Sequence, residues 1–131
     1  MTKLIATCHC GGTRIELPDV PRQATACTCT YRTKSGGLWA DYAEDHPTGQ
    51  PRILSDTYGK VYSASDGLNR HHFCSNCGCQ TYGVSPEWTM AHIENPTLPT
   101  RSKLAINTRL LDDFAAFQAV ELRPIDGRNL W

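Results

Sequence analysis

Short runs in which apolar and polar residues alternate recur along the chain and are separated by turn residues. TRIEL at residues 13–17 has the two-residue period of a half-buried strand, and none of the runs sustains a helical period. Turn signals such as Gly11-Gly12 and HPTGQP at residues 46–51 punctuate the pattern. The other strand-length runs are KLIAT, LWADY, RILS, KVYSAS, QTYGV, KLAIN and AVELRP. The pattern predicts a mainly β fold.

One segment favours a helix. In LDDFAAF, Asp112 or Asp113 stands where an aspartate caps a helix N-terminus, ahead of one or two turns. We expect at most this one short helix. No linker, repeat or low-complexity tract divides the chain, and its 131 residues suit one hydrophobic core. We therefore predict a single domain over residues 1–131.

Charge and hydropathy exclude two classes of partner. Thirteen basic and thirteen acidic side chains give a formal net charge of zero, and no run of lysine or arginine suits a phosphate backbone. No apolar run approaches the roughly 20 residues of a membrane span, and MTKLIATCHC lacks the apolar core of a signal peptide. We expect a cytoplasmic protein that binds neither nucleic acid nor membrane. These features do not determine its oligomeric state.

Cysteines are the main chemical signal. The chain has seven, an odd number that complete disulfide pairing inside one molecule would not accommodate. In a reducing compartment, clustered thiols are more often metal ligands than disulfides. The thiols fall in three groups, which are Cys8 with Cys10, Cys27 with Cys29, and Cys74 with Cys77 and Cys79.

The spacing within these groups suits zinc. Zinc–thiolate bonds of about 2.3 Å in a tetrahedron place neighbouring sulfurs about 3.8 Å apart. Cys74 and Cys77 have the C-x2-C spacing of a zinc knuckle, whereas Cys8 and Cys10 would point to one face of a strand. Two such pairs from distant parts of the chain can close a four-thiolate structural site. Spacing alone leaves open which two pairs do so.

Longer motifs carry a family resemblance. The segments CHCGGTRIE, CTCTYRTKSGGLWADY, HHFCSNCGCQTYG, KLAINTRLL and PIDGRNLW, in this order from Cys8 to Trp131, resemble the glutathione-dependent formaldehyde-activating enzyme (GFA) family, which also includes centromere protein V. The resemblance implies a zinc-bearing β-tent fold of short antiparallel strands with zinc knuckles. It also implies a carbon–sulfur lyase type of reaction, in which formaldehyde and glutathione combine to S-(hydroxymethyl)glutathione, with zinc as the cofactor.

The resemblance also assigns the cysteines. It places a structural zinc on a set of four thiols, Cys8, Cys10, Cys74 and Cys77. A second zinc of the family is held by a C-x-C-x-x-C loop, whose first two ligands match Cys27 and Cys29. The third position carries Arg32, which cannot bind a metal. Cys79 is the spare thiol that can replace this ligand, so Cys27, Cys29 and Cys79 are the candidate catalytic site, an open metal or thiol site.

Other residues have both a functional and a structural interpretation. Arg32 is a candidate partner for a carboxylate of glutathione, although an exposed arginine in a polar loop is the simpler interpretation. Trp39 suits the core better than the wall of a ligand pocket. Asn107 suits hydrogen bonding to backbone groups better than contact with substrate. His72 is the best histidine candidate for contact with the metal centre, although a strand histidine without that role is the simpler interpretation.

Three functions follow from these features. The first is a zinc enzyme of the GFA type that acts on glutathione or a glutathione adduct. The second is a non-catalytic, zinc-stabilised binding module that lost the third ligand of the second site at Arg32. The third is a thiol redox protein that uses Cys27, Cys29 and Cys79.

Overall fold

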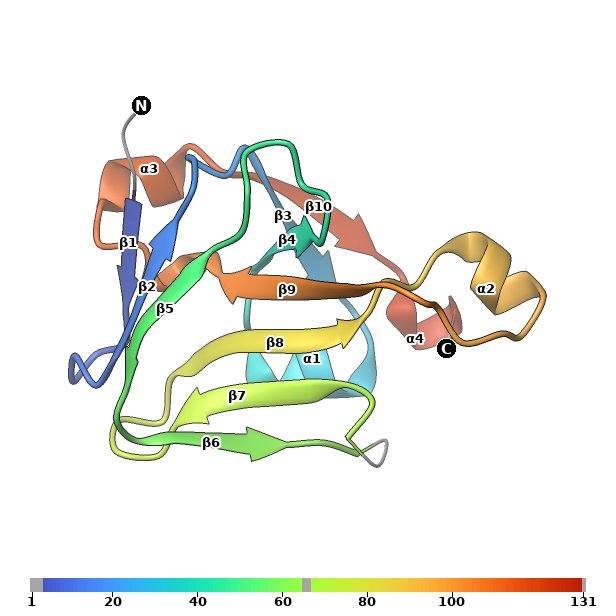
Figure 1. The fold of residues 1–131 in the computed structure, drawn as a ribbon, viewed down its shortest axis with the longest axis horizontal. Coiled ribbons are helices and arrows are strands. Elements are labelled where there is room, and N and C mark those ends of the chain that lie inside the picture. The colour runs from blue at the N-terminus through green and yellow to red at the C-terminus, as the bar shows by residue number, and fades with distance from the viewer. Residues whose placement is uncertain (1–3, 65–66, 131) are drawn as a thin grey trace.

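The fold consists of two β-sheets that meet at one end of the molecule (Figure 1). The computed structural model describes residues 4–64 and 67–130, so residues 1–3, Ser65 and Trp131 of the segments quoted above lie outside the described residues. One sheet has three strands in the order β1-β2-β5, namely β1 (Leu4–Thr7), β2 (Thr13–Leu17) and β5 (Arg52–Asp56). The other has seven strands in the order β10-β3-β4-β9-β8-β7-β6, which are β3 (Gln23–Cys27), β4 (Trp39–Ala43), β6 (Gly59–Tyr62), β7 (Arg70–Cys74), β8 (Gln80–Pro86), β9 (Ser102–Asn107) and β10 (Glu121–Ile125).

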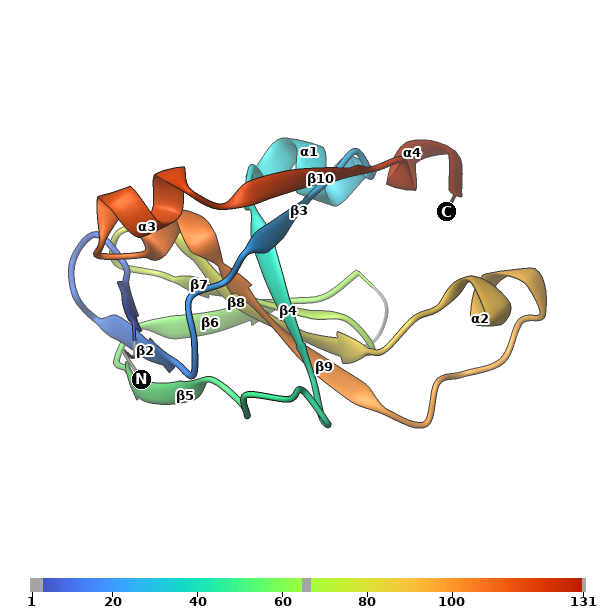
Figure 2. The same ribbon diagram turned by 90° about the horizontal axis from the view of Figure 1, so that it is seen from above.

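The seven-stranded sheet divides into two layers at the contact between β3 and β4. The pairing between β3 and β4 is limited to one position, where Thr25 lies opposite Trp39, whereas β4 and β9 pair along their whole length. Figure 2 shows β3 and β10 in one layer and β6 to β9 in the other, with β4 crossing between them. Paired strands are antiparallel except β10 and β3, which are parallel. The mainly β, largely antiparallel fold predicted for the chain is confirmed.

Each strand-length run predicted from the sequence forms a strand, but β3 and β7 are not predicted. QATAC in β3 contains no large apolar side chain, and RHHFC in β7 contains two histidines, so neither shows a strong two-residue period. Each is paired on both sides, β3 with β10 and β4, and β7 with β6 and β8. Backbone pairing in the folded sheet therefore stabilises two segments whose side chains only weakly favour strands.

The expected helix is confirmed as α3 (Phe114–Gln118), where the Asp113 carboxylate accepts a hydrogen bond from the Ala116 N–H at 3.1 Å. The described residues also form further short helices that exceed the expected single one, namely α1 (Thr30–Ser35), α2 (Met90–Glu94), the 3-10 helix η1 (Thr108–Leu110) and α4 (Gly127–Leu130). Elements of one or two turns are too short to show a helical period. None of the helices described is long and apolar enough to cross a membrane.

The core lies where β1 and β2 face β4, β8 and β9. Along β2, the buried Ile15 and Leu17 alternate with exposed Arg14 and half-buried Glu16, as TRIEL predicts. Their side chains join a buried cluster with Leu4, Ala6, Ala24, Ala40, Tyr42, Tyr82, Ile106, Leu111 and Val120. This packing holds the turn after β1 against the turn after β7. Both turns carry cysteines.

Candidate metal centre and the Cys27–Cys29 loop

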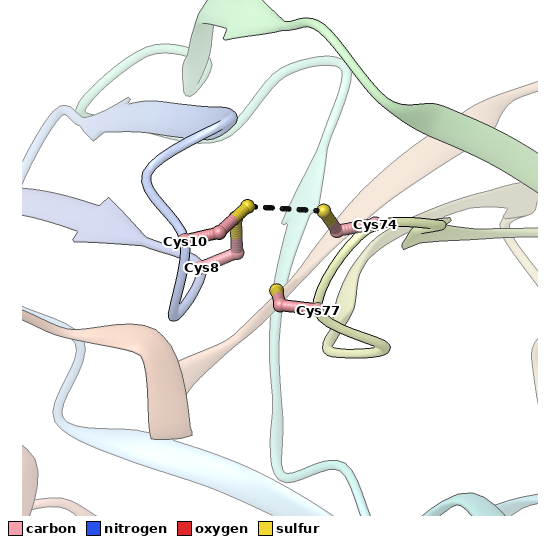
Figure 3. Close-up of side chains that lie close together, drawn as sticks. All are labelled: Cys8, Cys10, Cys74 and Cys77. Carbon is pink, nitrogen blue, oxygen red and sulfur yellow. Dashed lines mark hydrogen bonds between the residues drawn. The ribbon is translucent and has the colours of Figure 1, made fainter.

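Four cysteine sulfurs converge between these two turns (Figure 3). The sulfurs of Cys8, Cys10, Cys74 and Cys77 all lie within 4.8 Å of one another. Sulfur–sulfur distances are 3.7 Å from Cys8 to Cys10 and 3.6 Å from Cys10 to Cys74, close to the roughly 3.8 Å edge of a zinc–thiolate tetrahedron. The four cysteines are positioned to bind a metal ion, and an all-thiolate donor set of this size fits zinc.

Backbone hydrogen bonds shape both halves of the centre. In the first turn, the Thr13 N–H donates to the Cys8 sulfur at 3.2 Å. In the second, the Gly78 N–H donates to the Cys74 carbonyl at 2.8 Å, and Gly78 has a φ of 82°, a left-handed conformation that favours glycine. Donors that fix a ligand sulfur and its turn before metal arrives favour binding.

The charge balance of the centre also favours a cation. Burial acts to raise the pKa of Cys77, but hydrogen bonds from the backbone of Cys79 and Cys10 and from nearby thiols outweigh it and lower the pKa to about 5. Burial raises the pKa of Cys74 to about 11. A bound zinc ion would supply the positive charge that lets buried Cys74 ionise as well.

Cys79 lies beside this centre and not with the Cys27–Cys29 pair. Its thiol is hydrogen bonded to the His9 backbone and to Cys77, and burial raises its pKa. The Cys79 carbonyl accepts a hydrogen bond from the Cys74 N–H at 2.9 Å, which ties the residue to the knuckle. Among the histidine, cysteine, aspartate and glutamate side chains of the described residues, the four-cysteine set is the only group of three or more that lie close enough to share a metal ion. The three-thiol site expected from Cys27, Cys29 and Cys79 does not form in the structure.

Cys27 and Cys29 lie where β3 ends and α1 begins, and both are half-buried. Cys29 is the N-cap of α1, and its sulfur accepts a hydrogen bond from the Arg32 N–H at 3.4 Å. The Cys29 N–H in turn donates to the Cys27 sulfur at 3.5 Å. Burial raises the pKa of Cys27. The loop thus presents two adjacent thiols that the local backbone orients.

Arg32 lies beside these thiols and is half-buried, which differs from the exposed arginine of the simpler interpretation. Its guanidinium carbon is 4.3 Å from the ring centroid of Trp39, which is 2% exposed and belongs to the core as expected. Burial lowers the pKa of Arg32, while the charges of Asp41 and the two cysteines act in the opposite direction. Because the positive charge of Arg32 lies next to both thiols, it repels a metal cation and opposes metal binding there. The residues present therefore do not fit the second zinc that the family resemblance implies.

The C-terminal segment covers this loop, an arrangement that sequence reasoning did not find because Asp126-Gly127 signals only a turn. The Thr28 N–H donates to the Ile125 carbonyl at 2.9 Å, and Arg128 Nε donates to the Thr28 carbonyl at 3.0 Å. A Cβ atom at Gly127 would lie 2.6 Å from the Cys27 sulfur. Arg128 is thus a second cation at the loop, and only glycine permits so close an approach.

Replacing Gly127 with alanine should detach α4 from the loop, because the added methyl group would also lie 2.9 Å from Cys29 Cβ. We expect hydrogen exchange at the Thr28 amide to become at least about tenfold faster, which corresponds to about 1.4 kcal/mol of lost protection. Gly83→Ala is the control, since the nearest atom to its new methyl would be 3.5 Å away. Equal exchange rates in both variants would contradict this packing.

Two further sequence interpretations can be compared with the structure. The Asn107 side-chain oxygen accepts hydrogen bonds from the Leu38 and Arg109 N–H groups, each at 3.2 Å, and its nitrogen donates to the Gln80 carbonyl at 2.9 Å. Its predicted backbone role is confirmed. The His72 ring stacks on Tyr82 at a centroid distance of 4.1 Å and is not part of the metal-ligating group found in the described chain.

The fold and site define a small β protein in which two turns position four cysteine thiols to bind one metal ion. A sequence profile of the family described as glutathione-dependent formaldehyde-activating enzyme matches residues 3–111, and the chain belongs to this family. The match ends before β10 and α4, the elements that cover the Cys27–Cys29 loop.

A solved structure and the curated proteins give two further comparisons. The chain is similar to the crystal structure of a Rhodobacter sphaeroides protein, with a TM-score of 0.61, 21% sequence identity, and coverage of 91% of this chain and 99% of that chain. At this identity the likeness shows the fold alone. None of the curated proteins compared with the chain matches it.

Proposed function

We propose that the protein is a zinc-stabilised GFA-family enzyme that binds glutathione, or a glutathione adduct, at the Cys27–Cys29 loop. The observation that carries this proposal is the placement of two cations, Arg32 and Arg128, against a loop of two thiols in a member of this family. Glutathione has two carboxylates and a thiol, and arginine suits carboxylate recognition. The reaction is of the carbon–sulfur lyase type, with formaldehyde as the family's aldehyde.

In this proposal the four-thiolate centre is structural. Zinc held by Cys8, Cys10, Cys74 and Cys77 would cross-link the turn after β1 to the turn after β7. All four coordination positions would be filled by protein, so the centre would keep no open position for a substrate. The chemistry therefore belongs to the loop.

At the loop, the positive charge of Arg32 would stabilise the substrate thiolate, which is the role that a second metal ion would otherwise have. The Arg32 guanidinium lowers the free energy of a glutathione thiolate brought beside it, because opposite charges attract strongly in a half-buried site. The thiolate lone pair then forms the carbon–sulfur bond with the aldehyde carbon, and the carbonyl oxygen takes up a proton equivalent to the one lost by the thiol. In the reverse direction the carbon–sulfur bond breaks and the thiolate leaves.

The test is the rate of adduct formation between glutathione and formaldehyde, followed by NMR against the spontaneous rate. The zinc-loaded protein should accelerate the reaction, and Arg32→Gln should weaken glutathione binding by about tenfold or more, as expected for loss of a charge-assisted hydrogen bond. Arg52→Gln is the control, because this arginine is 70% exposed at the edge strand β5. No acceleration, or equal effects of both substitutions, would contradict the proposal.

A second candidate function, a non-catalytic binding module, is favoured by the presence of Arg32 at the third ligand position. Glutathione binding without acceleration would identify a zinc-stabilised binding module that kept the fold and lost the reaction. A titratable disulfide between Cys27 and Cys29, without glutathione binding, would instead identify a thiol redox protein. In a reducing compartment such as the cytoplasm, these thiols would stay reduced and could contact a ligand or a metal.

A further inference from the structure

A groove of about 520 Å³ runs beside α1, on the side of the helix that faces β6, β7 and β8. Figures 1 and 2 show α1 lying over one face of this part of the larger sheet. The groove begins at Thr30, the residue after Cys29, so it adjoins the loop of the proposed function. The lining residues that matter below are Tyr31, Lys34, Ser35, Tyr62, His71 and Gln80.

Three nearly parallel rings form one wall of the groove. The Tyr31 ring stacks on His71 at a centroid distance of 4.0 Å and lies 5.5 Å from Tyr62, with interplanar angles of 23° and 13°. Tyr62 and His71 are direct partners across β6 and β7, so the sheet fixes their common face. Tyr62 is 49% exposed. Parallel rings with a half-exposed ring, Tyr62, at the end of the set favour another flat ring over an aliphatic group of the same size.

Polar groups at the groove select the rest of the ligand. Lys34 lies on α1 at the groove, and the ion pairs found among the described residues do not involve it. The Tyr31 hydroxyl donates to the Gln80 side-chain oxygen at 2.9 Å, which leaves the amide nitrogen of Gln80 as a donor. Two further polar atoms, Ser35 Oγ and His71 Nδ1, are buried without a hydrogen-bond partner. Because both atoms are screened from solvent, the polar contacts offered to a ligand come from Lys34 and Gln80.

The cation at the groove is the lysine and not the histidine. Burial, together with the charges of Arg32 and His72, lowers the pKa of His71 to about 4. At neutral pH the imidazole is therefore uncharged and contributes its ring face. Lys34 alone among these lining residues carries a formal positive charge, which suits a carboxylate.

We infer that this groove binds a planar aromatic group that carries a carboxylate, so that the substrate or adduct handled at the Cys27–Cys29 loop is larger than formaldehyde. A one-carbon aldehyde would leave the groove and its rings unused. The inference rests on the proposed function for the position of the reacting atoms, but the groove itself can be tested without glutathione.

The test is titration of the zinc-loaded full chain with 2-naphthoate and with decahydro-2-naphthoate, its saturated analogue of equal charge. We expect 2-naphthoate to bind about tenfold more tightly and to shift the His71 ring signals in NMR, because only the flat ring can extend the stack. Tyr62→Ala and Lys34→Gln should each weaken 2-naphthoate binding by roughly five- to tenfold. Val61→Ala is the matched control, since Val61 is equally exposed at 49% and precedes Tyr62 on the same strand.

The outcomes separate this inference from the proposed function. Equal binding of the two acids, or binding that neither Tyr62→Ala nor Lys34→Gln weakens, would overturn the groove as an aromatic site. If the protein still accelerated glutathione addition, the proposed function would stand without it. Selective 2-naphthoate binding by a protein that does not accelerate glutathione addition to formaldehyde would support the groove and overturn the proposed function.

Discussion

Replacing Cys74 with serine should abolish tight zinc binding and unfold the protein at ordinary temperature. Cys74 is fully buried, and its sulfur lies 3.6 Å from that of Cys10, at the junction of two turns far apart in sequence. Structural zinc contributes roughly 10–16 kcal/mol in small domains, whereas whole domains are stable by about 5–15 kcal/mol. Loss of the metal can therefore exceed the total stability. Elemental analysis should report the lost zinc, and circular dichroism should report the lost cooperative thermal transition.

Cys79→Ser is the matched control for this experiment. Cys79 contacts Cys77 but is not among the four converging sulfurs, so its replacement should leave zinc content near that of the parent protein. We expect a fall in stability of at most about 1–2 kcal/mol, as for most single substitutions away from a buried ligand. If both variants lost zinc and melted alike, or if the metal-free parent protein remained folded, the assignment of the structural centre would be wrong.

Replacing Arg32 with cysteine should raise the zinc content from about one to about two equivalents per chain. The change restores the C-x-C-x-x-C spacing with Cys27 and Cys29 and removes the positive charge that lies beside them. Because Cys79 is held at the other centre, the restored loop would have three thiolates and one open position. Such a site can bind the sulfur of glutathione, so addition to formaldehyde should also become faster.

Arg32→Ser separates the two effects of this substitution. Serine is close to cysteine in size and also removes the charge, but it supplies no thiolate. Elemental analysis after dialysis should show the second equivalent of zinc in the cysteine variant only. A second equivalent in both variants would mean that charge alone excludes the metal, and a second equivalent in neither would mean that the loop geometry does not suit zinc.

Local spacing was enough to predict the two halves of the metal centre. A C-x2-C turn followed by Gly78 brings Cys74 and Cys77 together through backbone geometry that depends on neighbouring residues. Cys8 and Cys10 also come together, but they lie in the turn between β1 and β2, where the Gly11 N–H donates to the Cys8 carbonyl, and not on a strand as expected. The alternation in TRIEL likewise predicted which side chains of β2 are buried, because successive side chains of a strand face opposite sides. The union of the two cysteine pairs came from the family resemblance, since no local rule links positions 8 and 74.

The sequence by itself thus determined the class of fold, the close spacing within each cysteine pair and the arginine at position 32, all of which depend on residue type and short spacing. Only the tertiary structure decided that Cys79 stays at the knuckle, that Gly127 packs on Cys27, and that Tyr31 stacks on His71. These contacts join residues from separate elements, and their geometry follows from strand register and from the position of α1 over the sheet. Neither quantity is encoded in the spacing of residues along one segment, because both result from packing the whole core at once.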